Sequence, residues 1–336
     1  HHFSRQGQYY DAEPLYREAL EVIRRTLGVE HPTTIMSIGS MGNVLYQQGQ
    51  YTEAEPLYRE ALEASRRTLG DEHPKTILWI GNMGGLLSNQ GHYTEAEPLF
   101  REALEASRRT LGDEHPQTIR LIGYLANLLY KQDQYTEAEP LLRETLEASR
   151  RTLGDEHPET IMSIGRMGML LSNQGHYTEA EPLYRETLEA SRRTLGDEHP
   201  TTITSIGLMG NVLYLQGHYT EAEPLYREAL EASRRTRGDE HPETIMSIGR
   251  VGNLLYLQGH YTEAEPLYRE ALEASRRTLG DEHPTTQYNM ETLVLLYDDW
   301  DAADPGQGHA AKADALRREF GIEPSTTDPP AEADGS

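Results

Sequence analysis

The dipeptide His-Pro occurs seven times in this sequence, and each copy follows the previous one by 42 residues. The histidines are His31, His73, His115, His157, His199, His241 and His283. A fixed period of this length is typical of stacked supersecondary units, each of which buries its apolar face against a neighbouring unit. The sequence therefore predicts a repeat protein, and not the two or so globular domains that a length of 336 residues would otherwise suggest.

The first half of each unit has the pattern of an amphipathic helix. In the segment 32–48, Ile35, Ile38 and Leu45 fall on one face of a helix with 3.6 residues per turn. Pro32 occupies the first helical position, where a missing backbone N–H has no consequence because that group has no partner within the helix. We therefore expect a helix that begins directly after each histidine.

The second half of each unit predicts another helix, over 52–69 in the first copy. Thr52 and Glu55 have the spacing of a capping box, and Glu55 precedes Arg59 by four residues, which favours an ion pair on the helix surface. Gly70 follows the last apolar residue and can adopt the positive φ that often ends a helix. Each unit is therefore a helix pair joined by a short turn.

The repeat register divides the chain into four parts. Six complete helix pairs are predicted at about 32–69, 74–111, 116–153, 158–195, 200–237 and 242–279. A lone second helix at 8–27 precedes them, and altered helices at 284–300 and 309–320 follow. The predicted parts are a truncated leading repeat at 1–29, six complete repeats at 30–281, a degenerate capping repeat at 282–321 and a disordered acidic tail at 322–336. Because His1 lies inside a repeat, we expect the chain to be part of a longer protein.

Composition excludes several classes of partner and site. The formal net charge of −24 disfavours nucleic acid and anionic membranes, because both would be repelled by the protein's field. The absence of cysteine excludes disulfides and thiolate metal sites, and it is compatible with a cytoplasmic location. The sequence contains no run of 18 apolar residues, so it predicts no membrane span.

The residues shared by all units are similar to a known family. Aligned on Ile38, Met41-Gly42, Leu45, Ala54, Tyr58 and Ala61, each unit resembles the tetratricopeptide repeat. The long second helix and the linker 69–74 resemble the 42-residue variety found in kinesin light chains. This resemblance implies an all-α fold, a right-handed superhelical α-solenoid of antiparallel helix pairs, whose first helices line a concave groove that binds proteins or peptides.

A comparison of the six units with one another predicts where a partner binds. The first helices differ mainly at the positions of Met36, Ser40, Asn43 and Gln47, which form one stripe opposite the buried face. None of the 24 residues at these positions is acidic, and four are basic. The amides, apolar groups and cations favour an extended peptide with acidic and apolar side chains. The predicted groove residues are Asn43, Asn82, Arg120, Tyr124, Asn127, Lys131, Arg166, Leu208, Asn211, Leu215, Arg250, Asn253 and Leu257.

The sequence gives no support for catalysis. The recurring group Asp71-Glu72-His73 contains potential metal ligands, but successive copies are a full repeat apart and cannot converge on one ion, so helix capping explains the histidines better. Phosphate-binding loops, nucleophile elbows and kinase signatures are absent. We therefore expect no catalytic, cofactor-binding or metal-binding residue. Three functions remain: a scaffold for peptides or proteins, a cargo adaptor of the kinesin-light-chain type, or the sensor segment of a larger ATPase or kinase.

Overall fold

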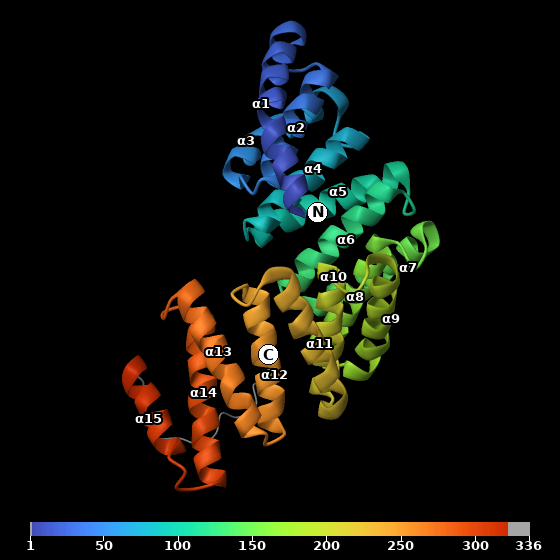
Figure 1. Cartoon of the computed structure of the whole chain (residues 1–336). Helices are drawn as coiled ribbons and strands as arrows, with labels where there is room; N and C mark the ends of the chain where they lie inside the picture. The colour runs from blue at the N-terminus through green and yellow to red at the C-terminus, as the bar shows by residue number, and fades with distance from the viewer. Residues whose placement is uncertain (1, 322–336) are drawn as a thin grey trace. The chain divides into compact units, whose positions relative to one another are not determined.

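The computed structural model describes residues 2–321, with side chains from Glu13 onward. Fifteen α-helices and no strand occur over residues 2–321, which confirms the all-α prediction (Figure 1). The chain divides into two units, His1–Gln174 and Gly175–Ser336, and each is described by itself. The predicted acidic tail at 322–336 lies outside the described residues. The boundaries of the four predicted parts stay a prediction.

The helix bounds follow the 42-residue register. Unit 1 contains α1 (His2–Leu27), α2 (Pro32–Gln47), α3 (Tyr51–Leu69), α4 (Pro74–Asn89), α5 (Tyr93–Leu111), α6 (Pro116–Lys131), α7 (Tyr135–Leu153) and α8 (Pro158–Asn173). Unit 2 contains α9 (Tyr177–Leu195), α10 (Pro200–Leu215), α11 (Tyr219–Arg237), α12 (Pro242–Leu257), α13 (Tyr261–Leu279), α14 (Pro284–Ala303) and α15 (His309–Phe320). The even-numbered helices are thus the first helices of the repeats, and α3 to α13 with odd numbers are the second helices.

Every first helix begins at a histidine cap. The imidazole Nδ1 of His31 accepts a hydrogen bond from the backbone N–H of Thr33 at 3.2 Å, and the other six histidines make the same bond at 3.1–3.2 Å. The following proline occupies the first helical turn in each case. Each histidine therefore satisfies one of the N–H groups that a helix leaves without a partner at its start.

The second helices begin differently from the prediction. The helix α3 starts at Tyr51, one residue before Thr52, and its N-terminus has no side-chain cap, so the predicted capping box is wrong. The turn between α2 and α3 is short, with Gly49 at φ +78°, and the ring of Tyr51 lies 5.5 Å from that of Tyr46. The equivalent helices α5 and α9 also begin at a tyrosine, Tyr93 and Tyr177, and Glu55 pairs instead with Arg59 at 2.8 Å, as the spacing predicts.

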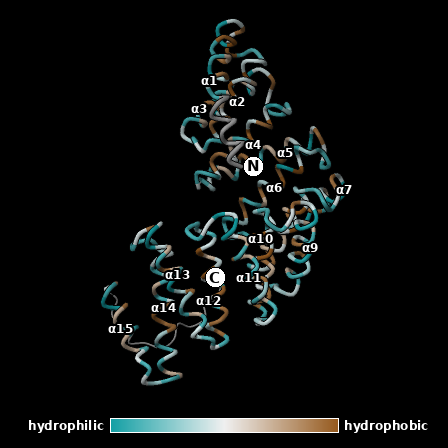
Figure 2. The backbone as a smooth tube through the Cα atoms, in the orientation of Figure 1, coloured by the Kyte–Doolittle hydropathy of each residue, from teal (hydrophilic) through white to brown (hydrophobic). Residues whose placement is uncertain are grey.

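The core consists of the apolar faces of neighbouring helices. Tyr58 is 2% exposed and its ring fills the space beside Gly42, where a Cβ would lie 2.8 Å from the ring. Ala54 and Ala61 of the same helix are fully buried. Small residues at these positions let α2 and α3 approach closely, and hydrophobic residues recur at intervals along the helices of both units (Figure 2).

Ion pairs join successive second helices across repeats. Arg108 of α5 pairs with Glu144 of α7 at 2.7 Å, and Arg66 of α3 pairs with Glu102 of α5 at 2.5 Å. The same pair recurs 36 residues apart at Arg24–Glu60, Arg192–Glu228 and Arg234–Glu270. Because these side chains are partly exposed, each pair contributes about 0–1 kcal/mol, so the apolar contacts dominate stacking.

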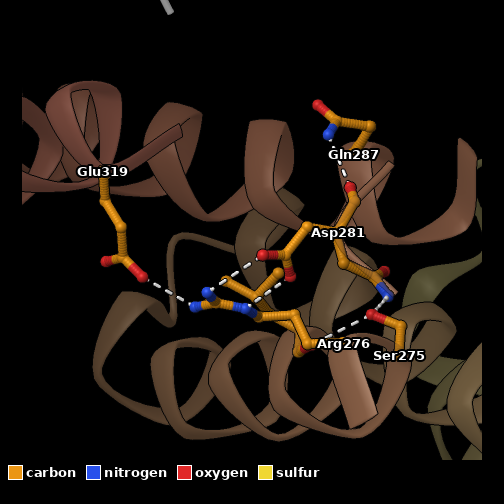
Figure 3. A network of polar contacts seen from close by, with 7 residues as sticks. Ser275, Arg276, Asp281, Gln287 and Glu319 are labelled. Atoms are coloured by element: carbon orange, nitrogen blue, oxygen red, sulfur yellow. Dashed lines mark hydrogen bonds and ion pairs between the residues drawn. The ribbon is translucent and has the colours of Figure 1, made fainter. Parts of the chain in front are cut away.

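The last two helices close unit 2. The structure confirms the predicted helices at 284–300 and 309–320 as α14 and α15, although α14 continues to Ala303. His309 at the start of α15 is 7% exposed, and its ring stacks on Trp300 at a centroid distance of 3.9 Å. Ala313 of α15 is fully buried. The shorter helix α15 thus packs on α14 in the place of a regular second helix, with its Glu319 paired to Arg276 of α13 (Figure 3).

Candidate functional site

Five of the predicted groove residues of unit 1 line one cavity. Asn43 of α2, Asn82 of α4, Tyr124 and Asn127 of α6, and Arg166 of α8 surround a volume of about 260 Å³. They come from four consecutive first helices, which the constant repeat register places side by side. The cavity lining contains no acidic residue.

Amides and tyrosine hydroxyls form the polar lining of this cavity. The hydroxyl of Tyr58 donates to Asn43 Oδ1 at 2.6 Å, and Asn82 Nδ2 donates to the same oxygen at 3.3 Å. Asn89 Nδ2 donates to the hydroxyl of Tyr46. These bonds occupy the side-chain oxygen of Asn43 and one N–H of the Asn82 amide. The amide NH2 of Asn43 and the side-chain oxygen of Asn82 remain for a bound group.

Arg166 is the single charged residue that lines the cavity. Its side chain is exposed to solvent, yet burial among the surrounding protein atoms lowers the pKa of its guanidinium, against the opposing influence of the nearby Tyr124. A side chain that is both accessible and partly desolvated is expected on the floor of a concave surface. A charge in such a place binds an anion more strongly than a charge on an open surface does.

The four basic residues of the predicted stripe share one property. Among the described residues, Arg120, Lys131, Arg166 and Arg250 form no ion pair with an acidic side chain. Lys131 lies over the ring of Tyr93, 5.8 Å from its centroid, and Arg120 is exposed; neither lines the cavity of unit 1. By contrast, Arg192 on a second helix pairs with both Asp197 and Glu228.

A second cavity in unit 2 contains two more predicted residues. Arg250 and Asn253 of α12 line a volume of about 430 Å³ between α12 and α14, together with Met246 and Tyr288. Asn253 Oδ1 accepts a hydrogen bond from the hydroxyl of Tyr268 at 2.7 Å, and its Nδ2 donates to the hydroxyl of Tyr288 at 3.1 Å. Asn253 thereby holds Tyr288 in place at the cavity.

The first-helix face of unit 2 is more apolar than that of unit 1. Every exposed large hydrophobic side chain in the described part of unit 2 lies at a stripe position of a first helix: Leu215, Met246, Leu257, Tyr288 and Leu295. The predicted Leu208 and Asn211 of α10 are half-buried, and Asn211 accepts a hydrogen bond from Tyr226 at 3.4 Å. Leu208, Asn211, Leu215 and Leu257 do not line the cavity beside Tyr288.

Sequence reasoning missed Tyr288 and Leu295, which belong to the capping repeat. Tyr288 is six repeats after Met36, and Leu295 is six repeats after Asn43, so the register of the stripe continues into α14. The repeat period contained this signal, but the prediction ended at the last complete repeat. Tyr46 and Tyr58 were also missed, because both look like core residues in the helix pattern.

The largest of these cavities lies elsewhere, between the second helices α5 and α7. It measures about 560 Å³, and Leu104, Leu125, Pro140 and Leu141 form its apolar lining. Arg101 joins the two helices through a hydrogen bond to Glu137 at 2.9 Å. The three arginines of this cavity all form ion pairs with acidic residues, so it offers no free cation to a ligand.

Comparison with known sequences and structures identifies the repeat. A sequence profile of the tetratricopeptide repeat matches residues 35–108, 76–128, 119–192, 162–235 and 204–277, and a second tetratricopeptide repeat profile matches residues 3–33. The chain belongs to the tetratricopeptide repeat family. No curated protein sequence matches it.

Solved structures share the tetratricopeptide fold. BtubC (BKLC) from P. vanneervenii is 18% identical, with 69% of this chain and 91% of that chain covered and a TM-score of 0.58. A putative kinesin light chain of Podosopora anserina with nearly identical TPR-like repeats is 25% identical, with 62% and 98% covered and a TM-score of 0.55. A signal transduction ATPase with a tetratricopeptide repeat sensor, from Pyrococcus horikoshii, is 13% identical; the match covers 94% of this chain but 46% of that protein, with a TM-score of 0.68.

The family and the described residues also concern the predictions on catalysis, membrane spans and metal ligands. Tetratricopeptide repeats form scaffolds, and no catalytic family matches the chain. Residues 2–321 include no helix of the length and apolarity needed to cross a membrane. Within the described residues no cluster of three or more potential metal ligands occurs. The recurring histidines are helix caps, as the sequence predicts.

Proposed function

We propose that this protein is a non-catalytic scaffold that binds extended peptide segments of partner proteins along the face of its first helices. The proposal rests on the ion pairing of the basic residues on that face, compared with those of the second helices. In a chain of net charge −24, acidic partners neutralise most arginines of the second helices, such as Arg192, whereas Arg166 and Arg250 beside the two cavities form no such pair among the described residues. Because neither forms an ion pair with an acidic side chain of the described residues, each can pair with a carboxylate of a ligand.

Each unit by itself offers different chemistry for peptide binding. In unit 1, the amides of Asn43, Asn82 and Asn127 can exchange hydrogen bonds with a peptide backbone, while Arg166 takes an acidic side chain. In unit 2, the exposed Leu215 and Leu257 offer contacts to apolar side chains. A partner that mixes acidic and large apolar residues is therefore favoured over a basic one.

Two narrower versions of this function follow from the comparisons. The putative kinesin light chain matches at 25% identity with almost all of its own length covered, which favours a cargo adaptor of that type. The ATPase sensor matches over nearly this whole chain and under half of its own, which favours a sensor segment of a larger ATPase or kinase. In each version the partner is a protein or peptide, and we propose a cytoplasmic location.

A peptide-library screen with matched charge reversals tests the proposal. We expect enrichment of peptides that combine acidic and large apolar residues. Arg166→Glu should weaken binding of the enriched peptides by about ten- to hundredfold, the effect of losing a hydrogen bond to a charged group worth about 1.5–3 kcal/mol. Arg25→Glu is the matched control. Arg25 is exposed on α1, which has the register of a second helix in unit 1, and it forms no ion pair among the described residues.

Arg192 is a poorer control than Arg25, since its replacement would also break ion pairs to Asp197 and Glu228. Unchanged helicity, measured by circular dichroism, shows that each variant is folded. Enrichment of basic peptides, or an equal loss from Arg25→Glu and Arg166→Glu, would reject the proposed binding face.

A further inference from the structure

In four of the complete repeats, a glycine of the first helix is matched to an aromatic ring of the following second helix. A Cβ on Gly42 would lie 2.8 Å from the ring of Tyr58. The same contact occurs at 2.8–3.0 Å in three further pairs, Gly84 with Phe100, Gly210 with Tyr226 and Gly252 with Tyr268. In these repeats the ring fills the space that the absent Cβ leaves.

Where this ring is a tyrosine, its hydroxyl has a partner on the first helix. The hydroxyl of Tyr58 donates to Asn43 Oδ1 at 2.6 Å. The same bond joins Tyr226 to Asn211 and Tyr268 to Asn253. In the second complete repeat both partners are missing together, because Phe100 has no hydroxyl and the stripe residue is Gly85. In these four repeats the hydroxyl and the amide therefore occur together or not at all.

The third complete repeat departs from this arrangement on both helices. Ala126 stands at the position of Gly42, and Leu142 stands at the position of Tyr58. Both side chains are buried. The stripe residue Asn127 is present, but Leu142 has no hydroxyl to donate, and the amide of Asn127 forms no hydrogen bond among the described residues. Asn127 therefore keeps its full capacity to donate and accept.

A pocket of about 150 Å³ lies beside Leu142 in unit 1. Its lining residues are Asn127, Tyr130, Leu142, Arg166 and Met169, which come from α6, α7 and α8. In the first complete repeat, the ring of Tyr58 lies 6.4 Å from the ring of Tyr46, the equivalent of Tyr130. The pocket thus lies in the place of the ring that the third repeat lacks. An apolar cavity of this size holds a molecule as large as benzene.

This pocket adjoins the polar cavity of unit 1. Asn127 and Arg166 line both the pocket and the cavity of about 260 Å³. Arg166 is the single charged residue of the two linings. A ligand that occupies both spaces therefore needs an apolar group no larger than a phenyl ring beside a carboxylate. Alternate side chains of an extended peptide point to the same face, so two residues separated by one other meet this requirement.

The geometry points to the pocket beside Leu142 as the site that selects the apolar side chain of a bound peptide. A side chain of the size of leucine or phenylalanine fills the pocket, and the carboxylate of an acidic residue two positions away pairs with Arg166. The amide of Asn127 exchanges hydrogen bonds with the peptide backbone between them. Tryptophan is disfavoured, because its indole is larger than the pocket. This assignment rests on the proposed function, since it takes the ligand to be a peptide.

A variant that restores the regular pair tests the assignment. Ala126→Gly combined with Leu142→Tyr recreates the contact between glycine and tyrosine that other repeats contain, so it should fill the pocket and occupy Asn127 without loss of helicity. Ala126→Gly alone is the matched control, because it introduces the same glycine and leaves the pocket open. The probe is phenylpropionate, which carries a phenyl ring and a carboxylate, and the NMR signal of the Met169 methyl group reports its binding to the full chain.

We expect a saturable shift of this signal in the natural chain and in the control, and at least tenfold weaker binding to the double variant. Phenylpropionamide, which has no charge to pair with Arg166, should bind severalfold more weakly than phenylpropionate. Indolepropionate should also bind severalfold more weakly, because of its size. Absence of a saturable shift, equal binding to the two variants, or tighter binding of indolepropionate would overturn the assignment.

An enriched library peptide separates the assignment from the proposed function. The control should bind a peptide with leucine or phenylalanine at this place about tenfold more tightly than the same peptide with alanine, and the double variant should lose that preference. If peptides bind both variants with the same preference, the assignment fails and the scaffold function stands. If phenylpropionate distinguishes the two variants but no library peptide binds, the pocket is correct and the peptide-binding function fails.

Discussion

The indole of Trp79 in α4 occupies the space directly beside Gly39 in α2. A Cβ added to Gly39 would lie 2.0 Å from Cη2 of the indole, and Trp79 is 1% exposed. The first helices of the first two complete repeats therefore meet without room for a methyl group. A glycine lowers helix propensity by about 1 kcal/mol relative to alanine, and this contact explains why glycine is nevertheless present.

Replacement of Gly39 by alanine should destabilise the protein. We expect a loss of about 1–3 kcal/mol in the free energy of unfolding, because the buried indole has to shift out of a well-packed site. Gly85→Ala in α4 is the control: a Cβ there meets nothing within 4 Å, so helix propensity should raise stability by up to about 1 kcal/mol. Urea denaturation followed by circular dichroism measures both. A stabilised Gly39→Ala variant would contradict the packing described.

Loss of one histidine cap should destabilise one helix start. His115→Ala removes the acceptor for the N–H of Gln117, which now lies 3.1 Å from Nδ1, and should cost about 1 kcal/mol. His115→Asn, which restores a side-chain acceptor at the cap, should recover most of that loss. Thermal unfolding of the three chains measures it. Equal losses in both variants would show that ring packing, and not the hydrogen bond, is what the histidine provides.

The contact between α13 and the cap should weaken in acid. Burial alone would raise the pKa of Glu265, but hydrogen bonds from Tyr297, Lys312 and Arg269 outweigh burial and lower this pKa in the folded state. The stabilisation is complete above the unfolded-state pKa, about 4.3, and is lost as the pH falls through the lower folded-state value. Glu265→Gln should therefore lower the thermal midpoint at pH 7 and have no effect near pH 2.

Glu139→Gln is the matched control for this pH dependence. Glu139 holds the equivalent position in α7, where its one ion pair among the described residues is with Arg143 at 3.0 Å. Its replacement should change the midpoint much less at pH 7. A midpoint difference for Glu265→Gln that persists unchanged at low pH would rule out the carboxylate as its origin.

Removal of the cap should cost more than removal of a repeat. Deletion of the residues after Ala303 uncovers the face of α14 that α15 covers, including the surroundings of the buried Ala313. Deletion of 74–115 removes one 42-residue unit but leaves the ends of the array unchanged, so the midpoint should fall only slightly. Calorimetry of both deletions against the full chain measures the difference. Equal losses would show that α15 is not a cap.

The sequence predicts this fold well because the residues that start and end each helix are close together in the chain. Each His-Pro pair marks the start of a first helix, and each glycine at the position of Gly70 marks the end of a second one, with φ near +86° at Gly70 itself. The capping box at Thr52 failed because the second helices begin one residue earlier, at Tyr51 and at its equivalents Tyr93 and Tyr177. The Thr-x-x-Glu pattern alone does not indicate that earlier start.

The candidate site is less accessible to sequence reasoning. The repeat register assigns Asn43, Asn82, Tyr124, Asn127 and Arg166 to one face of the first helices, and these five residues line one cavity. Whether a gap is open depends on the side chain opposite each glycine, such as Trp79 opposite Gly39 and none opposite Gly249. That depends on rotamers and helix spacing, which a residue pattern does not specify. What binds on this face stays a prediction.

The ion pair between each second helix and the next has an evolutionary consequence. Five second helices offer an arginine such as Arg66 to the next second helix, and the glutamate that it pairs with lies 36 residues further on each time. A recombination event that adds or removes whole 42-residue segments within such a run therefore leaves the arginine and glutamate of the new junction matched. The number of units can change without compensating mutations, and with it the length of partner that the protein can accommodate. Natural variation in this family should thus appear first as changes in copy number.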